Sequence, residues 1–133
     1  MNALTQGQSL YDSIGGEEEI RRLVEAFYDI IETDPEAEEL HLLHLRGHGV
    51  AHSRIEQFNF LSGFLGGPQY YVQKYGHSHL REIHVHIPIG HKERDIWLAC
   101  MAKAITMVGI EAPTADRLMR HLVRAAELCV NQE

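Results

Sequence analysis

The stretch that decides the fold runs from Gly66 to Trp97 and reads GGPQYYVQKYGHSHLREIHVHIPIGHKERDIW. Its double glycine and proline end one helical pattern, and a helix carrying the only tryptophan begins near Glu93. Between them lies an irregular, histidine-rich connection. A mostly helical protein rarely has about 25 irregular residues unless they are functional. Imidazole groups directly before a tryptophan helix predict a bound metal or metallocofactor with an aromatic wall.

The sequence on either side of this stretch has the spacing of amphipathic helices. Apolar residues recur at i, i+3, i+4 and i+7 from Glu17 to Thr33, and Pro35 ends that helix. Similar spacing predicts helices over 52–65, 93–108 and 113–130, a turn or two over 69–74, and a broken segment over 36–49. The alternation of 83–89 is short and contains Pro88, so it does not predict a strand. We therefore expect an all-α domain at residues 11–133 after a polar tail at residues 1–10.

Composition excludes several classes of protein. The net charge of −7 argues against a nucleic-acid partner, and no apolar run reaches the length of a membrane span. The N-terminus lacks the basic and apolar regions of a signal peptide. Cys100 and Cys129 fit two reduced thiols in the cytoplasm, although sequence alone leaves a disulfide between them open.

Histidine is unusually frequent in this sequence, at 10 of 133 residues. His84 is the first candidate ligand, because apolar residues flank it on both sides and an imidazole binds haem iron, zinc or copper. The pairs His77-x-His79 and His84-x-His86 leave a zinc site as an alternative. A third group shares one helix face only if the helix continues past two glycines: His44, His48 and His52.

Tyr28 and Trp97 are the aromatic candidates. Each, taken alone, fits a core residue. The indole N–H of tryptophan can only donate, so a buried Trp97 needs an acceptor, and a bound oxygen atom is one such acceptor.

Several motifs occur together in a particular order. They are Gly15-Gly16, Phe27-Tyr28, Gly66-Gly67-Pro68-x-x-Tyr71, Gly76-His77, Leu80-Arg81-x-x-His84 and Glu93-Arg94-Asp95-x-Trp97-Leu98-x-Cys100-Met101. On these motifs the chain resembles the truncated (two-over-two) haemoglobins, most closely their group II, over roughly residues 10 to 130. The resemblance implies a globin-like sandwich of helices around haem b, iron protoporphyrin IX.

The resemblance also implies roles around the haem iron. His84 corresponds to the proximal iron ligand, and Tyr28 and Trp97 correspond to distal residues that hydrogen-bond a bound gas. His41 falls at a position that is aromatic or histidine in the family, and either His41 or Tyr28 remains open as an iron ligand when no gas is bound. Two further positions face the ligand from the distal helix: Ser53 and Gln57.

A wider set of residues is expected to contact the haem itself. Tyr71 and Arg81 suit the haem edge, where propionates prefer hydrogen-bond donors and positive charge. The expected contacts are Phe27, Phe60, Leu61, Tyr71, His77, Arg81, Ile87, Ile89 and Met101. Two residues depart from the family pattern. Gln57 replaces a common leucine and adds a polar group, and Glu56 replaces a common basic residue, so one usual propionate anchor is absent.

The implied function is binding of dioxygen and other diatomic ligands, including nitric oxide and carbon monoxide, at a polar distal pocket. Each hydrogen bond to a partly charged ligand contributes roughly 1.5–3 kcal/mol. We therefore expect high affinity and slow release, which suit storage or redox chemistry better than oxygen transport. Two alternatives remain: a haem enzyme acting on nitric oxide or peroxide with an unidentified reductase, and a non-haem metal protein. We expect a monomer or weak homodimer and assign no catalytic residue.

Overall fold

The structure is a computed structural model that describes residues 9–132, and all of its regular elements are helical. They are α2 (Leu10–Ile14), α3 (Glu17–Thr33), the 3₁₀ turn η1 (Pro35–Ala37), α4 (Glu38–Arg46), α5 (Val50–Phe64), α6 (Tyr70–Tyr75), α7 (Leu80–His84), α8 (His91–Val108) and α9 (Ala112–Cys129). Residues 9–132 contain no strand, which confirms the all-α class. None of these helices is both long and apolar enough to cross a bilayer. The predicted tail lies mostly outside the described residues.

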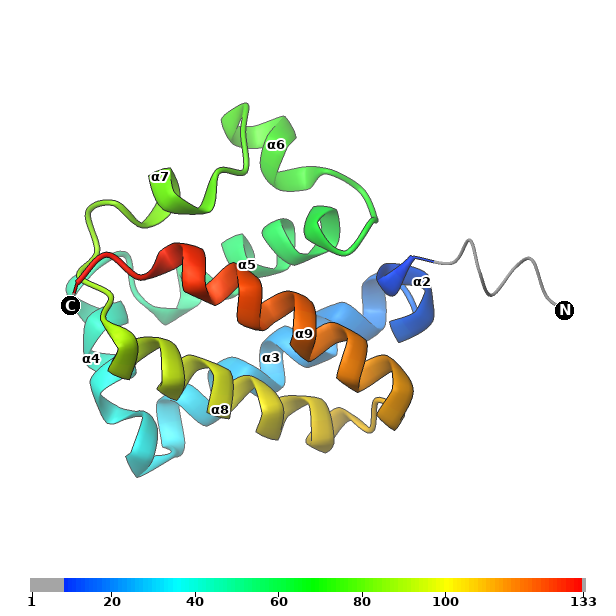
Figure 1. Cartoon of the computed structure of the whole chain (residues 1–133), viewed down its shortest axis with the longest axis horizontal. Helices are drawn as coiled ribbons and strands as arrows, with labels where there is room; N and C mark the ends of the chain where they lie inside the picture. Colours follow the sequence, from blue (N-terminus) through cyan, green and yellow to red (C-terminus); the bar gives the residue numbers. More distant parts are fainter. Residues whose placement is uncertain (1–8, 133) are drawn as a thin grey trace, which may run out of the picture.

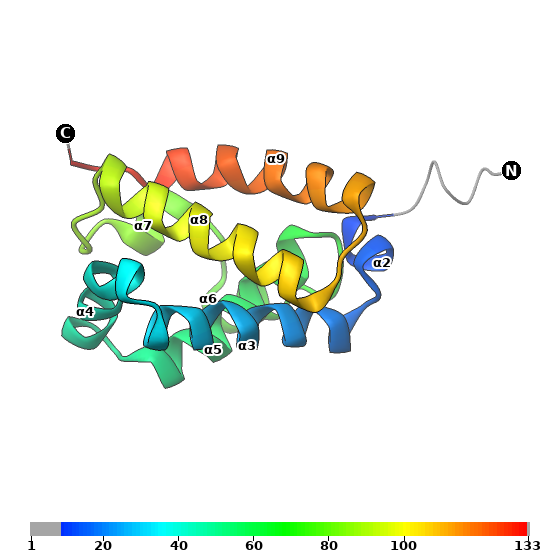
Figure 2. The ribbon, with the colours of Figure 1, turned by 90° about the horizontal axis from the view of Figure 1, so that it is seen from below.

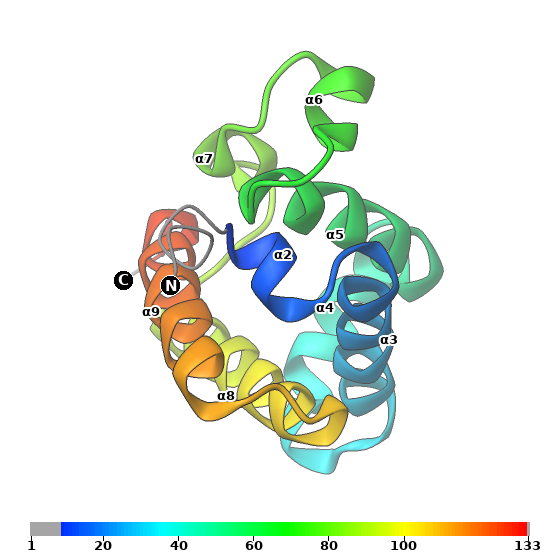
Figure 3. The same cartoon turned by 90° about the vertical axis from the view of Figure 1, so that its right-hand side faces the viewer.

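Two pairs of long helices build the molecule (Figure 1). Helix α3 packs beside α5, and α8 packs beside α9, as Figure 2 shows from below. Seen end-on in Figure 3, the two pairs face each other, with α3 also packing on α8. The short helices α6 and α7 form an arm that returns from α5 towards α9. This arrangement agrees with the expected two-over-two sandwich.

Helix α3 supplies the centre of the core because its apolar face is continuous. Ile20, Leu23, Val24, Phe27 and Ile31 are all at most 1% exposed. The helix begins after Gly16 with three glutamates in its first turn, which complement the positive end of the helix dipole. Opposite this face lie fully buried residues of α8 and α9, including Met101 and Leu118.

The double glycine that ends α5 is required by close packing against α2. Gly66 has a φ of +101°, a conformation that favours glycine. A Cβ added at Gly67 would lie 2.3 Å from the ring of Tyr11, too close for any other residue. The N–H of Tyr11 donates to the carbonyl of Leu65 at 2.9 Å, which fixes the contact. The motif therefore joins the N-terminal helix to the end of α5.

The irregular connection is more ordered than the sequence predicts. It contains the short helix α7, which ends at His84. Helix α8 begins at His91, where the Glu93 carboxylate accepts from the Gly90 N–H at 2.7 Å. Residues 47–49 separate α4 from α5, so His44, His48 and His52 do not share one continuous helix.

Candidate functional site

A cavity of about 610 Å³ lies between the two helix pairs, within the usual range for ligand sites. Every helix from α3 to α9 contributes to its wall. Most of the lining is apolar, and it includes Leu43, Phe60, Leu61, Leu80, Ile83 and Ala126. The cavity is therefore suited to a large apolar ligand.

His84, the last residue of α7, lines this cavity. Its Nδ1 lies 2.8 Å from the carbonyl oxygen of Leu80, one turn earlier in α7. A carbonyl only accepts, so Nδ1 carries the proton and Nε2 keeps a lone pair. Burial lowers the pKa of His84. The ring is therefore neutral near pH 7, the form that binds a metal.

Cys129 of α9 lies beside the same ring. Its Sγ is 3.5 Å from His84 Nδ1 and 3.4 Å from the carbonyl oxygen of Ala125. Burial raises the pKa of Cys129 to about 11, so the group is a neutral thiol. Both cysteines are free, as expected.

Tyr28 and Trp97 line the cavity together. The Phe27 ring packs against both, and its centroid lies 4.8 Å from that of Tyr28 and 5.2 Å from that of Trp97. Tyr28 is 2% exposed, and burial raises the pKa of its hydroxyl, which stays protonated. Among residues 9–132, neither the Tyr28 hydroxyl nor the Trp97 N–H has a hydrogen-bond acceptor. Two donors are therefore available to a ligand.

The distal helix α5 carries the two other polar residues expected here, Ser53 and Gln57, and both line the cavity. His44 also lines it, with its ring centroid 5.5 Å from that of Tyr28 and its Nδ1 2.8 Å from the Leu40 carbonyl. Burial lowers the pKa of His44. His41 is half-buried but does not line the cavity. The sequence reasoning did not single out His44 for this role, although Leu40 and Leu43 mark the same apolar helix face.

The residues expected to contact a cofactor fall into three groups. Five line the cavity: Phe60, Leu61, Tyr71, Ile87 and Ile89. Phe27 and Met101 are fully buried in the adjoining core, so they support the wall from behind. His77 and Arg81 do not line this cavity, so the structure does not bring these two expected residues to it.

Glu56 has a partner that the sequence did not indicate. Lys74 of α6 lies 2.8 Å from its carboxylate. Burial raises the pKa of Glu56, but hydrogen bonds from Lys74 and Tyr75 outweigh this and leave it lowered. The carboxylate is therefore ionised and paired, so its charge at the cavity edge is largely balanced by the lysine.

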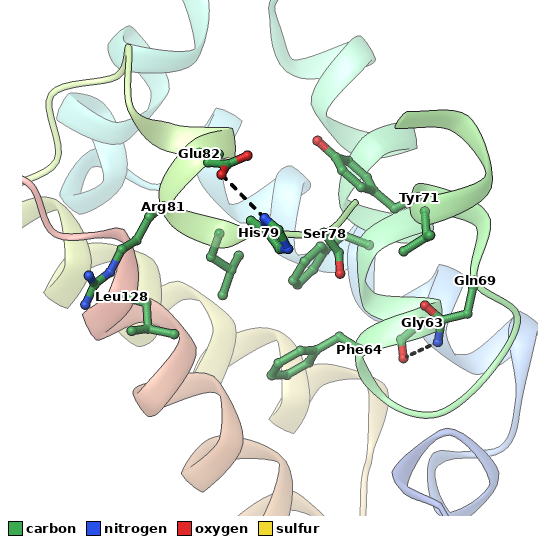
Figure 4. A pocket seen from close by; sticks show the side chains of 12 residues that line it. Gly63, Phe64, Gln69, Tyr71, Ser78, His79, Arg81, Glu82 and Leu128 are labelled. Carbon is green, nitrogen blue, oxygen red and sulfur yellow. Dashed lines mark hydrogen bonds and ion pairs between the residues drawn. The ribbon is translucent and has the colours of Figure 1, made fainter. Parts of the chain in front are cut away.

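A second hollow of about 490 Å³ adjoins the first and shares Phe60, Tyr71 and Leu80 with it. Figure 4 shows the Arg81 side chain turned towards Leu128 of α9. It also shows the contact at the start of α7 between His79 Nδ1 and the Glu82 carboxylate, which lie 3.5 Å apart. Arg81 therefore lies on the α9 side of α7 and lines this hollow rather than the main cavity.

Of the two histidine pairs that left a zinc site open, the structure gives His77 and His79 a third candidate ligand, Glu82, and the ligand atoms of the three lie within 4.8 Å of one another. Three ligands of a tetrahedral zinc ion lie only about 3.4 Å apart. The Nδ1 of His77 already accepts from the His79 N–H at 3.1 Å. The main cavity is therefore the better-formed metal site, because the His84 ring is oriented by its hydrogen bond and its Nε2 keeps a free lone pair.

These features together fit a flat, mostly apolar cofactor that carries a metal. The cavity has the volume and the apolar walls, and His84 offers one neutral nitrogen ligand. The buried Tyr28 hydroxyl has no acceptor among the residues that the structure describes, a state that costs roughly 1–3 kcal/mol. A small polar ligand in the cavity would satisfy it.

Comparisons with known proteins agree with this site. Residues 9–131 match the bacterial-like globin family. The chain is 34% identical over 129 residues to the group 2 truncated hemoglobin YjbI of Bacillus subtilis (strain 168), covering 95% of this chain and 93% of that protein. It is 35% identical to the group II 2-on-2 hemoglobin of Agrobacterium tumefaciens, with a TM-score of 0.88 and coverage of 96% and 98%. A truncated oxygen-avid haemoglobin from Bacillus subtilis is 31% identical, with a TM-score of 0.80 and coverage of 93% and 100%.

The helical sandwich and its cavity thus define a globin that binds haem and small diatomic ligands. The chain belongs to the bacterial-like globin family, among the group II truncated haemoglobins with the two-over-two fold.

Proposed function

We propose that this protein binds dioxygen with high affinity and releases it slowly. The observation that carries the proposal is the pair of unpartnered donors, Tyr28 and Trp97, on the wall of the cavity that also contains His84. The similarity to a haemoglobin described as oxygen-avid supports the same function.

We further propose that the cofactor is haem b and that His84 binds its iron through Nε2. The Leu80 carbonyl holds the ring in the tautomer that this requires. Cys100 and Cys129 are far apart in sequence and lack the C-x-x-C-H spacing of covalently attached haem, which favours a non-covalent haem. Haem supplies an iron atom that binds diatomic gases reversibly. The protein contributes apolar walls, one axial ligand and polar groups for the gas.

Tyr28, Trp97 and Gln57 are the proposed donors to the bound ligand. A hydrogen bond to a charged acceptor contributes roughly 1.5–3 kcal/mol. Two such bonds slow escape of a polar ligand by about 100-fold or more, because each 1.4 kcal/mol is tenfold. Ser53 borders the same region and helps to keep it polar. Either His41 or Tyr28 stays a proposed ligand of the iron in the gas-free state. His44 is a competing candidate because, unlike His41, it lines the cavity.

We place the protein in the cytoplasm as a monomer or weak homodimer. Its free thiols support a reducing compartment.

A second candidate function is redox turnover of nitric oxide or peroxide, supported by the number of polar groups on the distal side. This activity needs a reductase to restore the ferrous state. Stopped-flow mixing of the oxygenated protein with nitric oxide, with a reductase supplied, separates catalysis from storage. Repeated turnover would favour the enzyme, and a single stoichiometric reaction would favour binding.

The main test is the oxygen dissociation rate of the wild type and of Trp97→Phe. The substitution removes the indole N–H and retains an aromatic ring beside Phe27. We expect release to become about tenfold faster or more. A fast wild-type rate that Trp97→Phe leaves unchanged would contradict the proposal.

A further inference from the structure

The segment that follows α9 returns to the loop that follows His84. Figure 1 shows the C-terminal end of α9 beside this loop. The Asn131 side-chain amide donates to the carbonyl oxygens of His84 at 3.1 Å and Ile87 at 2.9 Å. Its Oδ1 accepts from the Ile89 N–H at 2.9 Å. The Asn131 side chain therefore makes three hydrogen bonds, two as donor and one as acceptor, to the backbone of His84 and the loop that follows it.

The main chain strengthens the same connection. The N–H groups of Asn131 and Gln132 both donate to the Ile89 carbonyl, at 2.8 and 3.0 Å. Within the loop, Val85 is 62% exposed and Ile87, which lines the cavity, is 37% exposed. Hydrogen bonds from the C-terminal segment therefore add to the limited apolar packing that holds the loop in place.

Cys129 acts on the ring of the same histidine. Its thiol donates to the Ala125 carbonyl, so the sulfur lone pairs are free to face the His84 Nδ1–H. That N–H then lies between two acceptors, the Leu80 oxygen at 2.8 Å and the Cys129 sulfur at 3.5 Å. Two acceptors restrict rotation of the ring about its Cβ–Cγ bond and keep Nε2 directed into the cavity.

We propose that Asn131 and Cys129 form a C-terminal clamp that positions His84 towards the haem. Asn131 fixes the backbone of the histidine, and Cys129 fixes its ring and adds electron density to it. The clamp rests on the proposed role of His84 as the iron ligand. Groups that hydrogen-bond to a metal-bound histidine set its orientation and basicity, so loss of the clamp weakens the bond between His84 and iron.

The test is the iron–histidine stretching band in the resonance Raman spectrum of the ferrous, gas-free protein, together with the rate of haem transfer to an excess of apomyoglobin. We expect Asn131→Ala to broaden the band and to speed haem loss about tenfold, corresponding to a net loss of about 1.4 kcal/mol. Asn131→Asp replaces both donors by a carboxylate oxygen that faces the carbonyl oxygens of His84 and Ile87, so its effect should be at least as large as that of Asn131→Ala.

Cys129→Ala should shift the band to lower frequency, and Cys129→Ser should restore part of the shift because its oxygen also accepts. Gln132→Ala is the matched control, since this residue contributes its backbone N–H alone and should behave as the wild type. A wild-type band that neither Asn131→Ala nor Cys129→Ala changes overturns the clamp. Absence of the band in a wild type whose ferrous absorption spectrum is five-coordinate overturns the role of His84 as iron ligand as well.

Discussion

Substituting Tyr28 by phenylalanine removes one oxygen atom from the cavity wall and leaves the ring in place. The edge-on contacts of this ring with Phe27 and His44, at centroid distances of 4.8 and 5.5 Å, involve the ring rather than the hydroxyl. The lost hydrogen bond to a bound, partly charged ligand corresponds to roughly 1.5–3 kcal/mol. Oxygen dissociation should therefore become about 10- to 100-fold faster.

The same substitution should leave the gas-free protein as stable as the wild type or slightly more stable, because the hydroxyl has no acceptor within residues 9–132. The assay is stopped-flow displacement of oxygen by carbon monoxide, with thermal unfolding of the gas-free ferric protein measured alongside. Carbon monoxide dissociation serves as a control, since this ligand carries little charge and should respond weakly. An oxygen rate within about twofold of wild type would refute the reasoning.

Three further predictions concern the rest of the molecule. Arg54 of α5 forms ion pairs with Glu25, Asp29 and Glu32 of α3. Arg54→Met should therefore lower the free energy of unfolding by about 1–2 kcal/mol, and the loss should be smaller at high salt because salt screens the charges. Urea unfolding at two salt concentrations measures this, and a loss that is absent or independent of salt would refute it. Burial lowers the pKa of His44 below its usual 6.5, so its contribution to stability is fully present above pH 6.5 and is lost as pH falls through the lowered value. His44→Gln should flatten the urea-unfolding stability profile below pH 6.5, and an unchanged slope would count against the assignment. Treatment with a strong chelator of divalent ions should leave the Soret absorbance intact, because haem iron is not held by His77 and His79; bleaching of the band would point back to a non-haem metal.

Much of the fold can be predicted because its long helices have regular apolar spacing. The bounds of α3 agree with the expected Glu17–Thr33, since acidic residues follow Gly16 and Pro35 stops the pattern. Helix α7 could not be predicted, because five residues within a histidine-rich segment carry too little periodicity. It forms through tertiary packing on α9.

The site could be predicted where a motif or an apolar neighbourhood marked it. His84, Tyr28 and Trp97 line one cavity, as expected. The sequence did not indicate the hydrogen bond between Asn131 and Ile89 or the ion pair between Lys74 and Glu56. These contacts join residues 42 and 18 positions apart, which a local pattern cannot show. The sequence offered His41 rather than His44 for the distal wall, because a choice between two histidines one turn apart depends on the exact rotation of a short helix.

The central claim is that the cavity holds haem through His84. The measurement is the absorption spectrum of haem-reconstituted protein, ferric and ferrous, with and without carbon monoxide, for the wild type and for His84→Gly with added imidazole. The account predicts a wild-type Soret band that shifts on adding carbon monoxide, an altered spectrum in His84→Gly, and recovery when free imidazole replaces the missing side chain. Lack of a Soret band in the wild type, or a His84→Gly spectrum identical to the wild type without imidazole, would contradict it.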